Sequence, residues 1–389
     1  MMEFEYWWLI VIPLIFGMGW LAARLDLKQL LHESRELPRA YFKGLNFLVN
    51  EQPDQAIDVF IEVMRLDPET IELHFALGNL FRKRGETDRA IRMHLNLYQR
   101  NDLEPAQREH ALFELGLDYM KAGLLDRAEQ SFAGLEGSRY SKDALLALLE
   151  IYQREHDWNK ALTAAQQLQQ SHGINQATLL AHFYCEQAQE AMQQQRWDAA
   201  QALLDQALKA CPGHVRTQIL QGELKQRQGQ DPQAAEIWSV LAQQQPDFLP
   251  LIARRYFAAM QAQGRTAEAE TRLRTALEKR PSHDILLTLF DTVQQAQGRP
   301  AALDLLKQEL RRAPTLQAFN RLLGGQLEQA PADERAYLES IKHLIHRHAR
   351  QMERYTCHAC GFKAREFYWQ CPGCASWDSY APQRQEEIE

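Results

Sequence analysis

The chain has 389 residues, a formal net charge of −7 and 45% hydrophobic residues. This length exceeds one ordinary core, so several domains or a repeat array are expected. The mildly acidic balance gives no overall attraction to nucleic acid or acidic lipid. The chain has six cysteines, four of them clustered near the C-terminus, which indicates metal binding in a reducing compartment rather than a secreted disulfide framework.

The N-terminal stretch at residues 6–23, YWWLIVIPLIFGMGWLAA, carries no charge. It approaches the length of ~20 residues that spans a bilayer as a helix, and tryptophans lie near both of its ends. Acidic residues precede it and basic residues follow it, which places the following side in the cytoplasm. We therefore predict an uncleaved transmembrane anchor at 1–24 and a juxtamembrane linker at 25–36. The alternatives are a cleaved signal peptide, which needs a positive leader, and a buried soluble helix.

An alanine recurs along the body of the chain at intervals of 33 to 39 residues. These alanines are Ala56, Ala90, Ala128, Ala161, Ala200, Ala234, Ala269 and Ala302. Twelve residues after five of them stands a proline, and twelve residues before four of them stands a glycine. Small residues suit positions where two antiparallel helices approach closely, and proline suits the start of the next unit.

This pattern resembles the tetratricopeptide repeat and covers residues 37–316 as eight units of about 34 residues. The resemblance implies an all-α solenoid with a concave groove that holds protein segments. An unrelated helical bundle is the alternative, but it does not explain the repeated spacing of alanine and proline. The fourth and fifth units depart most, because Leu149 and Ala188 stand at the glycine position.

In this repeat family the first helix of each unit lines the groove, so the resemblance also identifies candidate partner-binding residues. Carried over by position, they are Asn79, Arg82, Lys83, His110, Phe113, Lys121, Gln153 and Arg154. Basic and amide groups at these positions would hold an acidic peptide or a C-terminal carboxylate. The alternative is an ordinary solvated polar face.

Two further helical stretches at 317–352 are expected to cap the array. In the second, His343 and His346 would lie on one face and could bind metal, but a basic helix end is the favoured interpretation. We expect the C-terminal module to pack on the last helices through the histidine-rich segment 341–350.

The C-terminal module at 353–380 contains two Cys-x-x-Cys pairs, which are formed by Cys357, Cys360, Cys371 and Cys374. Each pair directs two thiolates to one point, and together they complete a tetrahedral site for one zinc or iron ion. The module resembles the paired knuckles of rubredoxin, although rubredoxin usually has a longer gap. Its aromatic residues would either pack structurally, which we favour, or stack on bases. The acidic tail at 381–389 is expected to be disordered.

The order of anchor, repeats and metal module is similar to that of the lipopolysaccharide assembly protein B (LapB) family of Gram-negative bacteria. The stretches GNLFRKRGETDRAIRMHLNL, GLDYMKAGLLDRAEQSF, AHFYCE and RYTCHACGFKAREFYWQCPGCASW carry the resemblance. It implies a cytoplasm-facing, single-pass inner-membrane adaptor that regulates lipopolysaccharide synthesis. It further implies partnership with the membrane protease FtsH and its client, the deacetylase LpxC, and with other lipopolysaccharide-assembly proteins; a homo-oligomer is also possible.

Two other classes of function stay open at this point. A rubredoxin-like electron-transfer protein would use iron redox chemistry at the four-cysteine site. A nucleic-acid-binding scaffold would use the metal module and the basic helix before it, although the charge balance makes nucleic acid an unexpected partner. No phosphate loop, nucleophile elbow or His-Glu-x-x-His motif occurs in the sequence, so a catalytic function is not expected.

Overall fold

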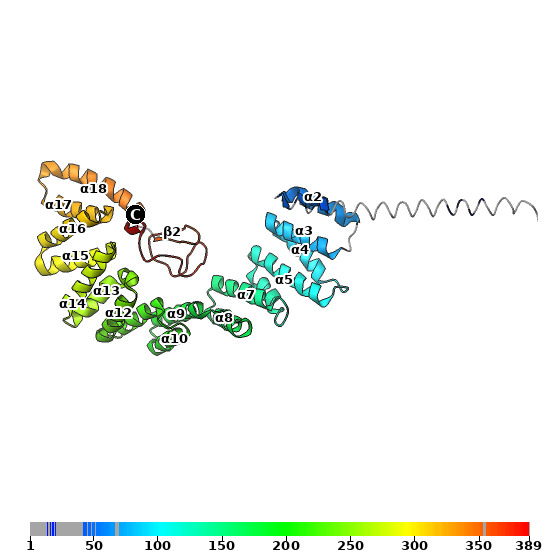
Figure 1. Ribbon diagram of the computed structural model, residues 1–389, viewed down its shortest axis with the longest axis horizontal. Helices are drawn as coiled ribbons and strands as arrows, with labels where there is room; N and C mark the ends of the chain where they lie inside the picture. The colour runs from blue at the N-terminus through cyan, green and yellow to red at the C-terminus, as the bar shows by residue number, and fades with distance from the viewer. Residues whose placement is uncertain are drawn as a thin grey trace, which may run out of the picture. The chain divides into compact units, whose positions relative to one another are not determined.

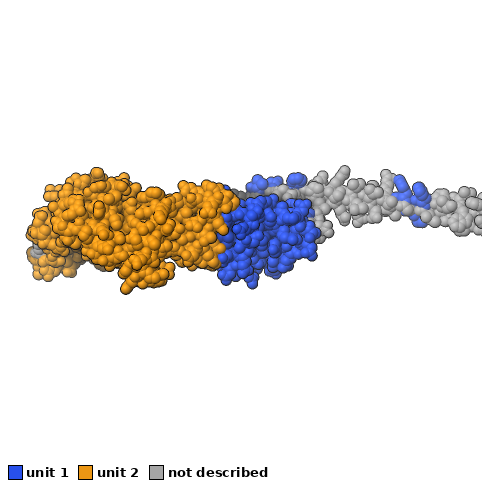
Figure 2. All heavy atoms as spheres, turned by 90° about the horizontal axis from the view of Figure 1, so that it is seen from below, with its two compact units in different colours: residues 1–151 blue, residues 152–389 orange. Residues whose placement is uncertain are grey.

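The computed structural model describes residues 14, 16, 18, 20, 42–44, 46–47, 49–50, 52–66, 70–352 and 355–388. The predicted anchor and linker lie almost entirely outside these residues. Within them, no helix combines the length and the apolar character that a membrane span requires. The described chain divides into two compact units, residues 1–151 and 152–389 (Figure 2).

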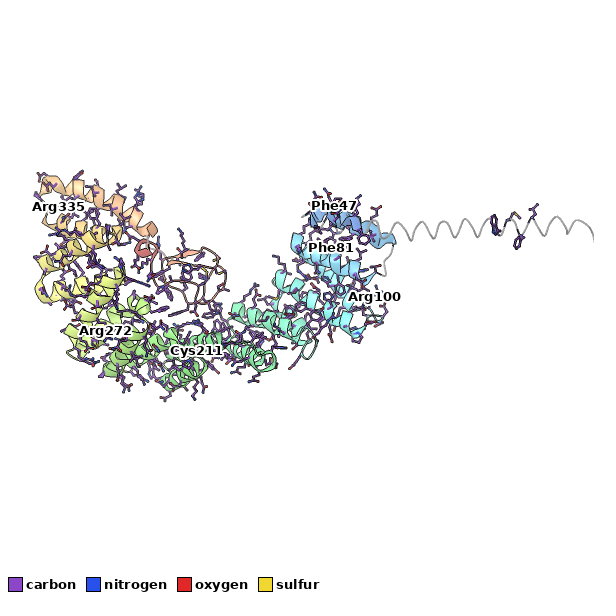
Figure 3. All side chains as sticks on the ribbon, viewed as in Figure 1. Phe47, Phe81, Arg100, Cys211, Arg272 and Arg335 are labelled. Atoms are coloured by element: carbon purple, nitrogen blue, oxygen red, sulfur yellow. The ribbon has the colours of Figure 1, made fainter. Side chains whose placement is uncertain are left out.

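The first unit is a succession of antiparallel helices (Figure 1). They are α2 (Pro53–Leu66), α3 (Ile71–Arg84), α4 (Thr87–Tyr98), α5 (Pro105–Lys121), α6 (Leu125–Ala133) and α7 (Ser141–Glu155), the last of which runs into the second unit. Phe81, labelled in Figure 3, packs in the core that α2, α3 and α4 share. The turn after α3 needs a glycine, because Gly85 has φ 84° while its N–H reaches back to the end of the helix.

The second unit continues the succession and adds the C-terminal module. Its helices are α8 (Trp158–His172), α9 (Ala177–Gln193), α10 (Trp197–Ala210), α11 (Val215–Arg227), α12 (Asp231–Gln244), η1 (Pro246–Phe248), α13 (Leu249–Ala262), α14 (Thr266–Lys279), α15 (His283–Gln297), α16 (Arg299–Arg312), α17 (Leu316–Gln329), α18 (Ala332–Met352) and α19 (Gln385–Ile388). Its strands are β1 (Tyr355–Thr356) and β2 (Lys363–Ala364). The two strands pair antiparallel, with Tyr355 opposite Ala364.

The recurring alanines are part of the core of the repeats, and all eight have 0% exposure. The glycine twelve residues earlier makes room for the large residue that lies four positions after the alanine. A Cβ on Gly222 would lie 2.2 Å from Nε1 of Trp238, and one on Gly116 would lie 2.6 Å from the ring of Phe132. Such distances are far inside van der Waals contact, so these positions exclude any side chain unless the partner moves.

The fifth repeat departs from the glycine pattern. It has a larger residue than glycine on one helix and a smaller residue than an aromatic on the other. Ala188 stands at the glycine position, and the residue that faces this site from α10 is Leu204 rather than an aromatic. Both are fully buried in one core cluster with Ala200. The added side-chain volume on one helix is offset by the smaller side chain on the other, and cores tolerate exchanges that keep the total volume.

The acidic tail is ordered, and the expectation of disorder for 381–389 is therefore wrong for the residues up to 388. Residues 385–388 form α19, and the Glu387 carboxylate accepts a 2.6 Å hydrogen bond from the backbone N–H of His283. Glu386 likewise accepts from the backbone N–H of Leu316. These donors belong to the first turns of α15 and α17, where N–H groups lack partners within the helix and the helix dipole favours negative charge.

Candidate metal centre and its docking on the repeats

The four cysteines of the C-terminal module converge as the sequence predicts. The sulfur atoms of Cys357 and Cys374 lie 3.8 Å apart, and those of Cys360 and Cys371 lie 3.7 Å apart. A tetrahedral ion with metal–sulfur bonds of about 2.3 Å separates its ligands by about 3.8 Å. The donor set and its spacing therefore fit one tetrahedral ion, and zinc and iron fit equally well because both form such bonds to thiolate.

The turns that hold the first cysteine pair follow from local sequence. Gly361 has φ 76°, a conformation that lets its N–H bond to the carbonyl of Cys357 at 2.8 Å. The residue after it, Phe362, returns the chain to Cys357 through a 2.9 Å backbone hydrogen bond. These two backbone hydrogen bonds close the turn of the first knuckle.

Polar groups behind the sulfurs favour the thiolate form that a metal needs. The hydroxyl of Ser379 lies 3.3 Å from Sγ of Cys357. Burial opposes ionisation of this thiol, but the hydrogen bonds with Ser379 and with backbone amides outweigh it and lower the pKa of Cys357 to about 6. Burial and the bond to Cys371 raise the pKa of Tyr380, so its hydroxyl stays protonated and lies 3.6 Å from Sγ of Cys371.

The centre has a covered side and an open side. Cys357 and Cys371 are buried, whereas Cys360 and Cys374 are exposed. The covered side joins a small core with Tyr355, Ala364 and Tyr380. A metal held here fixes the fold of a module too small to build a large core of its own.

The indole of Trp377 attaches this module to the repeats. Its ring stacks on His182 of α9 at 4.5 Å between centroids and meets Phe183 edge-on at 6.0 Å. Its Nε1 donates a 2.7 Å hydrogen bond to Oε1 of Gln153. The guanidinium of Arg216, at the start of α11, lies 5.8 Å from the ring centroid.

Two further contacts attach the module to later elements of the array, η1 and α15. Trp369 stacks on Phe248 of η1 at 5.9 Å with nearly parallel rings. Arg384 forms a 3.0 Å ion pair with Asp284 of α15, and its Nε lies 3.3 Å from the hydroxyl of Tyr355. The module thus lies along α9 to α15, as Figure 1 also shows.

The docking contacts described above come from α7, α9, α11, η1 and α15, and packing through residues 341–350 stays a prediction. The preference for structural packing of the aromatics agrees with the placement of Trp369 and Trp377. His343 and His346 lie on α18, and neither belongs to the two groups of clustered metal-ligand side chains found among the described residues.

Several predicted partner-binding residues of the first unit lie in an internal polar network. Arg82 bonds to Oε2 of Glu114 at 2.5 Å and to Oδ1 of Asp118 at 2.8 Å. Asn79 accepts a 2.6 Å hydrogen bond from the same guanidinium. The buried His94 lies 2.5 Å from the other oxygen of Asp118. Arg82 thus neutralises buried carboxylates, a task that the sequence alone does not reveal.

The remaining candidates divide by exposure. His110 stacks on Phe75 at 4.1 Å and on Tyr140 at 5.6 Å, and Phe113 stacks on Tyr140 at 5.0 Å. Gln153 is engaged by the metal module. The three that are exposed are Lys83, Lys121 and Arg154. Partner binding by this set stays a prediction.

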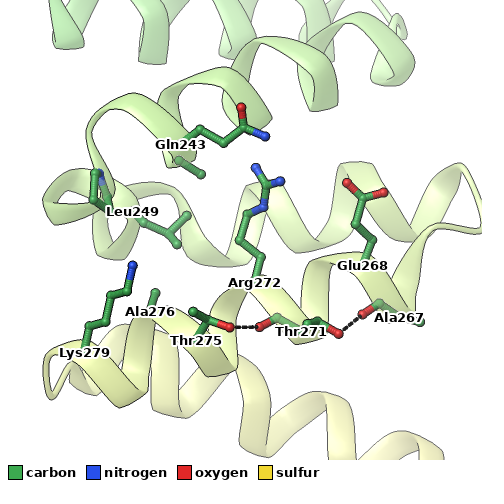
Figure 4. Close-up of a pocket in the computed structure, with 11 residues that line it drawn as sticks. Gln243, Leu249, Ala267, Glu268, Thr271, Arg272, Thr275, Ala276 and Lys279 are labelled. Atoms are coloured by element: carbon green, nitrogen blue, oxygen red, sulfur yellow. Dashed lines mark hydrogen bonds between the residues drawn. The ribbon is translucent and has the colours of Figure 1, made fainter.

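A separate hollow of about 690 Å³ lies between α12, η1 and α14 (Figure 4). Its walls carry Arg272 and Lys279 beside aliphatic groups such as Leu249. Arg272 donates a 2.8 Å hydrogen bond to the carbonyl of Ser239, and Thr271 and Thr275 bond to their own helix. The polar groups of Arg272, Thr271 and Thr275 are thus engaged within the fold.

The structure also brings together His182, His214 and Asp378, a group that sequence reasoning missed. His182 and His214 are 32 residues apart, close to one repeat length, so the repeat pattern contained a signal that they are neighbours. Nothing in the sequence pattern connects either histidine to Asp378.

The paired helices and the four-sulfur site define a tetratricopeptide-repeat protein with a C-terminal metal module. Residues 355–382 match the family model described as "Rubredoxin metal binding domain", and residues 73–107 and 185–247 match models described as "Tetratricopeptide repeat". These matches confirm the predicted fold class of the body and of the module.

The chain is 34% identical over 378 residues to lipopolysaccharide assembly protein B of Escherichia coli strain K12, covering 96% of this chain and 97% of that protein. It is 29% identical to the protein of the same name from Haemophilus influenzae, covering 97% and 98%. A solved tetratricopeptide-repeat protein from Parabacteroides merdae is similar at 13% identity and a TM-score of 0.34, covering 66% of this chain and 98% of that one. The chain belongs to the lipopolysaccharide assembly protein B family.

Proposed function

We propose that this chain is a non-enzymatic adaptor in lipopolysaccharide synthesis. In this proposal residues 1–24 anchor it in the inner membrane with its bulk in the cytoplasm, and it promotes proteolysis of the deacetylase LpxC by the protease FtsH. The names of its relatives support the role in lipopolysaccharide assembly. Anchoring would confine the chain to the surface where a membrane protease works and so raise its effective concentration there.

The observation that carries the adaptor role is the docking of the metal module on the repeats through Trp369 and Trp377. Repeat arrays offer extended surfaces for protein segments. A module fixed against such an array adds a second surface at a set position, as an adaptor that holds a client beside a protease requires. The metal in this scheme maintains the shape of the surface.

The test measures the half-life of LpxC in cells that lack the chain and are complemented with variants. We expect wild-type protein to shorten the half-life severalfold, and only while FtsH is active. A variant lacking residues 1–23 should be recovered in the soluble fraction and should not shorten it. An LpxC half-life that is the same with and without the wild-type chain would refute the proposal.

Crosslinking in intact membranes would locate the partner surfaces. Photoreactive residues at the exposed Lys83 and Arg154 sample the repeats, and one at the exposed Phe362 samples the open side of the metal module. Arg82 is a poor position, because its replacement would leave the buried Asp118 and Glu114 without their cation. Crosslinks to FtsH or LpxC from one of these sites would assign the surface, and crosslinks to neither from any site would count against the adaptor.

A second candidate, electron transfer, is favoured by the exposure of Cys360 and Cys374, which opens the metal centre to a redox partner. The two functions separate on metal exchange. Zinc carries no redox chemistry, so a zinc-loaded chain should still support LpxC turnover if it is an adaptor. Activity that requires iron would favour electron transfer instead.

A further inference from the structure

A second cluster of metal-binding side chains lies where the module meets the repeats. His182 lies on α9, His214 is the residue that precedes α11, and Asp378 comes from the module, four residues after Cys374. The ligand atoms of these three residues lie within 4.8 Å of one another. His182 is fully buried and His214 is 8% exposed. The side chain of Asp378 is 45% exposed, so the cluster has one wall open to solvent.

The distance between the two imidazole ligands matches that around a transition-metal ion. Nε2 of His182 and Nε2 of His214 lie 3.4 Å apart. Two imidazole ligands at about 2.05 Å in a tetrahedral site are separated by about 3.3 Å. Oδ2 of Asp378 lies 2.9 Å from Nε2 of His182. That pair is at hydrogen-bond distance, so it would widen by a few tenths of an ångström if an ion replaced the shared proton.

The protons available on the two imidazoles cannot satisfy all three ligand atoms, whereas an ion between them could. Both imidazoles are buried, and a neutral imidazole carries a proton on one ring nitrogen and a lone pair on the other. If His182 donates its Nε2 proton to Asp378, it has none to share with His214. If it accepts a proton from His214, two electron-rich atoms face each other at the carboxylate. Either way one lone pair in a buried site has no good partner, whereas a cation satisfies all three atoms at once.

The surrounding groups orient the His214 ligand and cover the ring of His182. Nδ1 of His214 lies 2.8 Å from the hydroxyl of Thr217, which in turn lies 3.2 Å from Sγ of Cys185. Metal-ligating histidines use such a bond on the second ring nitrogen to set their tautomer and orientation. Trp377 covers one face of the His182 ring. The positive charge of the nearby Arg216 is compensated by Glu186 at 2.8 Å.

We propose that His182, His214 and Asp378 form a second metal site, separate from the four-cysteine centre, for a divalent transition ion such as Zn²⁺. Two imidazoles and one carboxylate suit zinc and its neighbours, and water from the open side would complete four ligands. Binding displaces to solvent whichever proton lies between the two imidazoles, that on Nε2 of His182 or that on Nε2 of His214. Because two ligands come from the repeats and one from the module, the ion clamps the module in place.

Cobalt titration of the full-length chain in detergent tests this site, after the chain has been loaded with a single equivalent of zinc, which the four-thiolate centre takes first. Co²⁺ at a nitrogen and oxygen site gives weak visible absorption without the strong thiolate charge-transfer band of a four-cysteine site. We expect one equivalent of Co²⁺ with that spectrum in the wild-type chain. A chain that holds one zinc ion, in the four-cysteine centre, and takes up no Co²⁺ would overturn the proposal.

Substitutions then assign the ligands. His214→Gln and Asp378→Asn should each weaken Co²⁺ binding at least about 100-fold, while the zinc content of the four-cysteine centre stays the same. Thr217→Val should weaken it about 10–100-fold, the effect typical of losing an orienting partner. His172→Gln, at an exposed histidine on α8, is the matched control and should change nothing. Unchanged binding in His214→Gln and Asp378→Asn would overturn the assignment.

One more variant separates loss of a ligand from loss of docking. Asp378→His removes the carboxylate but supplies an imidazole, which is also a zinc and cobalt ligand. We expect it to bind Co²⁺ again with a nitrogen-rich spectrum, and to lose it when combined with His214→Gln. Equal binding by Asp378→His and by the double variant would contradict the proposed site.

Discussion

Nε1 of Trp377 donates a 2.7 Å hydrogen bond to Oε1 of Gln153, a residue 224 positions earlier in the chain. The same indole stacks on His182 and meets Trp158 edge-on at 6.3 Å. One side chain of the metal module therefore joins helices that belong to different repeats. It is the natural target for separating the folding of the module from its docking.

Trp377→Ala should release the module from the repeats without unfolding it. The change removes an aromatic contact surface and one hydrogen bond, which together contribute about 2–3 kcal/mol. We expect faster hydrogen exchange in α9 and greater protease sensitivity around residue 350, with the metal of the four-cysteine centre retained. Trp377→Phe keeps the stacking and loses only the hydrogen bond, so its effect should be about 1 kcal/mol. Equal effects of the two variants would contradict this division of the energy.

Cys371→Ser should abolish metal binding and unfold the module. A buried hydroxyl cannot replace the fourth thiolate, and metal binding supplies most of the folding free energy of such a module, about 10–16 kcal/mol for structural zinc. Metal analysis of the purified chain and limited proteolysis check this outcome. Cys211→Ser is the control, because Cys211 lies outside the site and should leave metal content unchanged. A metal-filled Cys371→Ser chain would contradict the four-cysteine assignment.

Gly222→Ala should destabilise the second unit, because the new Cβ would lie 2.2 Å from Nε1 of Trp238. Overpacking of this kind costs about 1–3 kcal/mol. Gly324→Ala, also within a helix, is the matched control, since its Cβ would lie 3.4 Å from the flexible end of Lys342. That change should instead stabilise α17 by about 0.5–1 kcal/mol. Denaturant unfolding of both variants measures the expected difference in sign.

The buried carboxylate of Glu114 should make the first unit sensitive to acid. Burial opposes its ionisation, but the bonds from His110 and Arg82 outweigh burial and lower the pKa of Glu114 from 4.5 to about 2. A lowered pKa stabilises the fold above pH about 4.5, and this stability is lost as the pH falls toward 2. Hydrogen exchange of α5 amides should therefore accelerate over that range, corresponding to about 2 kcal/mol.

Glu114→Gln removes the titrating group and should flatten this dependence. The variant should also be less stable at neutral pH, because Arg82 loses one of its anionic partners. A wild-type chain whose α5 protection stays constant between pH 4.5 and 2 would contradict the argument.

The repeat pattern predicted most of the fold because its determinants are local and periodic. A buried alanine, a glycine twelve residues earlier and a proline twelve residues later each report the packing of one helix pair. The four cysteines were predictable for the same reason, since each pair lies within one tight turn. Sequence could not predict the docking of Trp377 on His182, because no period relates a module to the middle of an array.

The role of Arg82 was missed for a related reason. Its place on the first helix of a repeat indicates a groove residue. The carboxylates that it neutralises come from α5, in the next repeat. The tail was missed because its composition predicts disorder, whereas Glu386 and Glu387 find unpaired N–H groups at two helix starts. In both cases long-range polar partners override the local signal.

The contacts of the module have a mechanical consequence. A helical-repeat array can stretch and bend along its length, because each repeat contacts only its neighbours. Trp377 contacts α9, Trp369 contacts η1 and Arg384 contacts α15, so the module bridges several repeats. The docked module ties these repeats together, and residues 182 to 284 should therefore resist extension as one stiff body while it is docked.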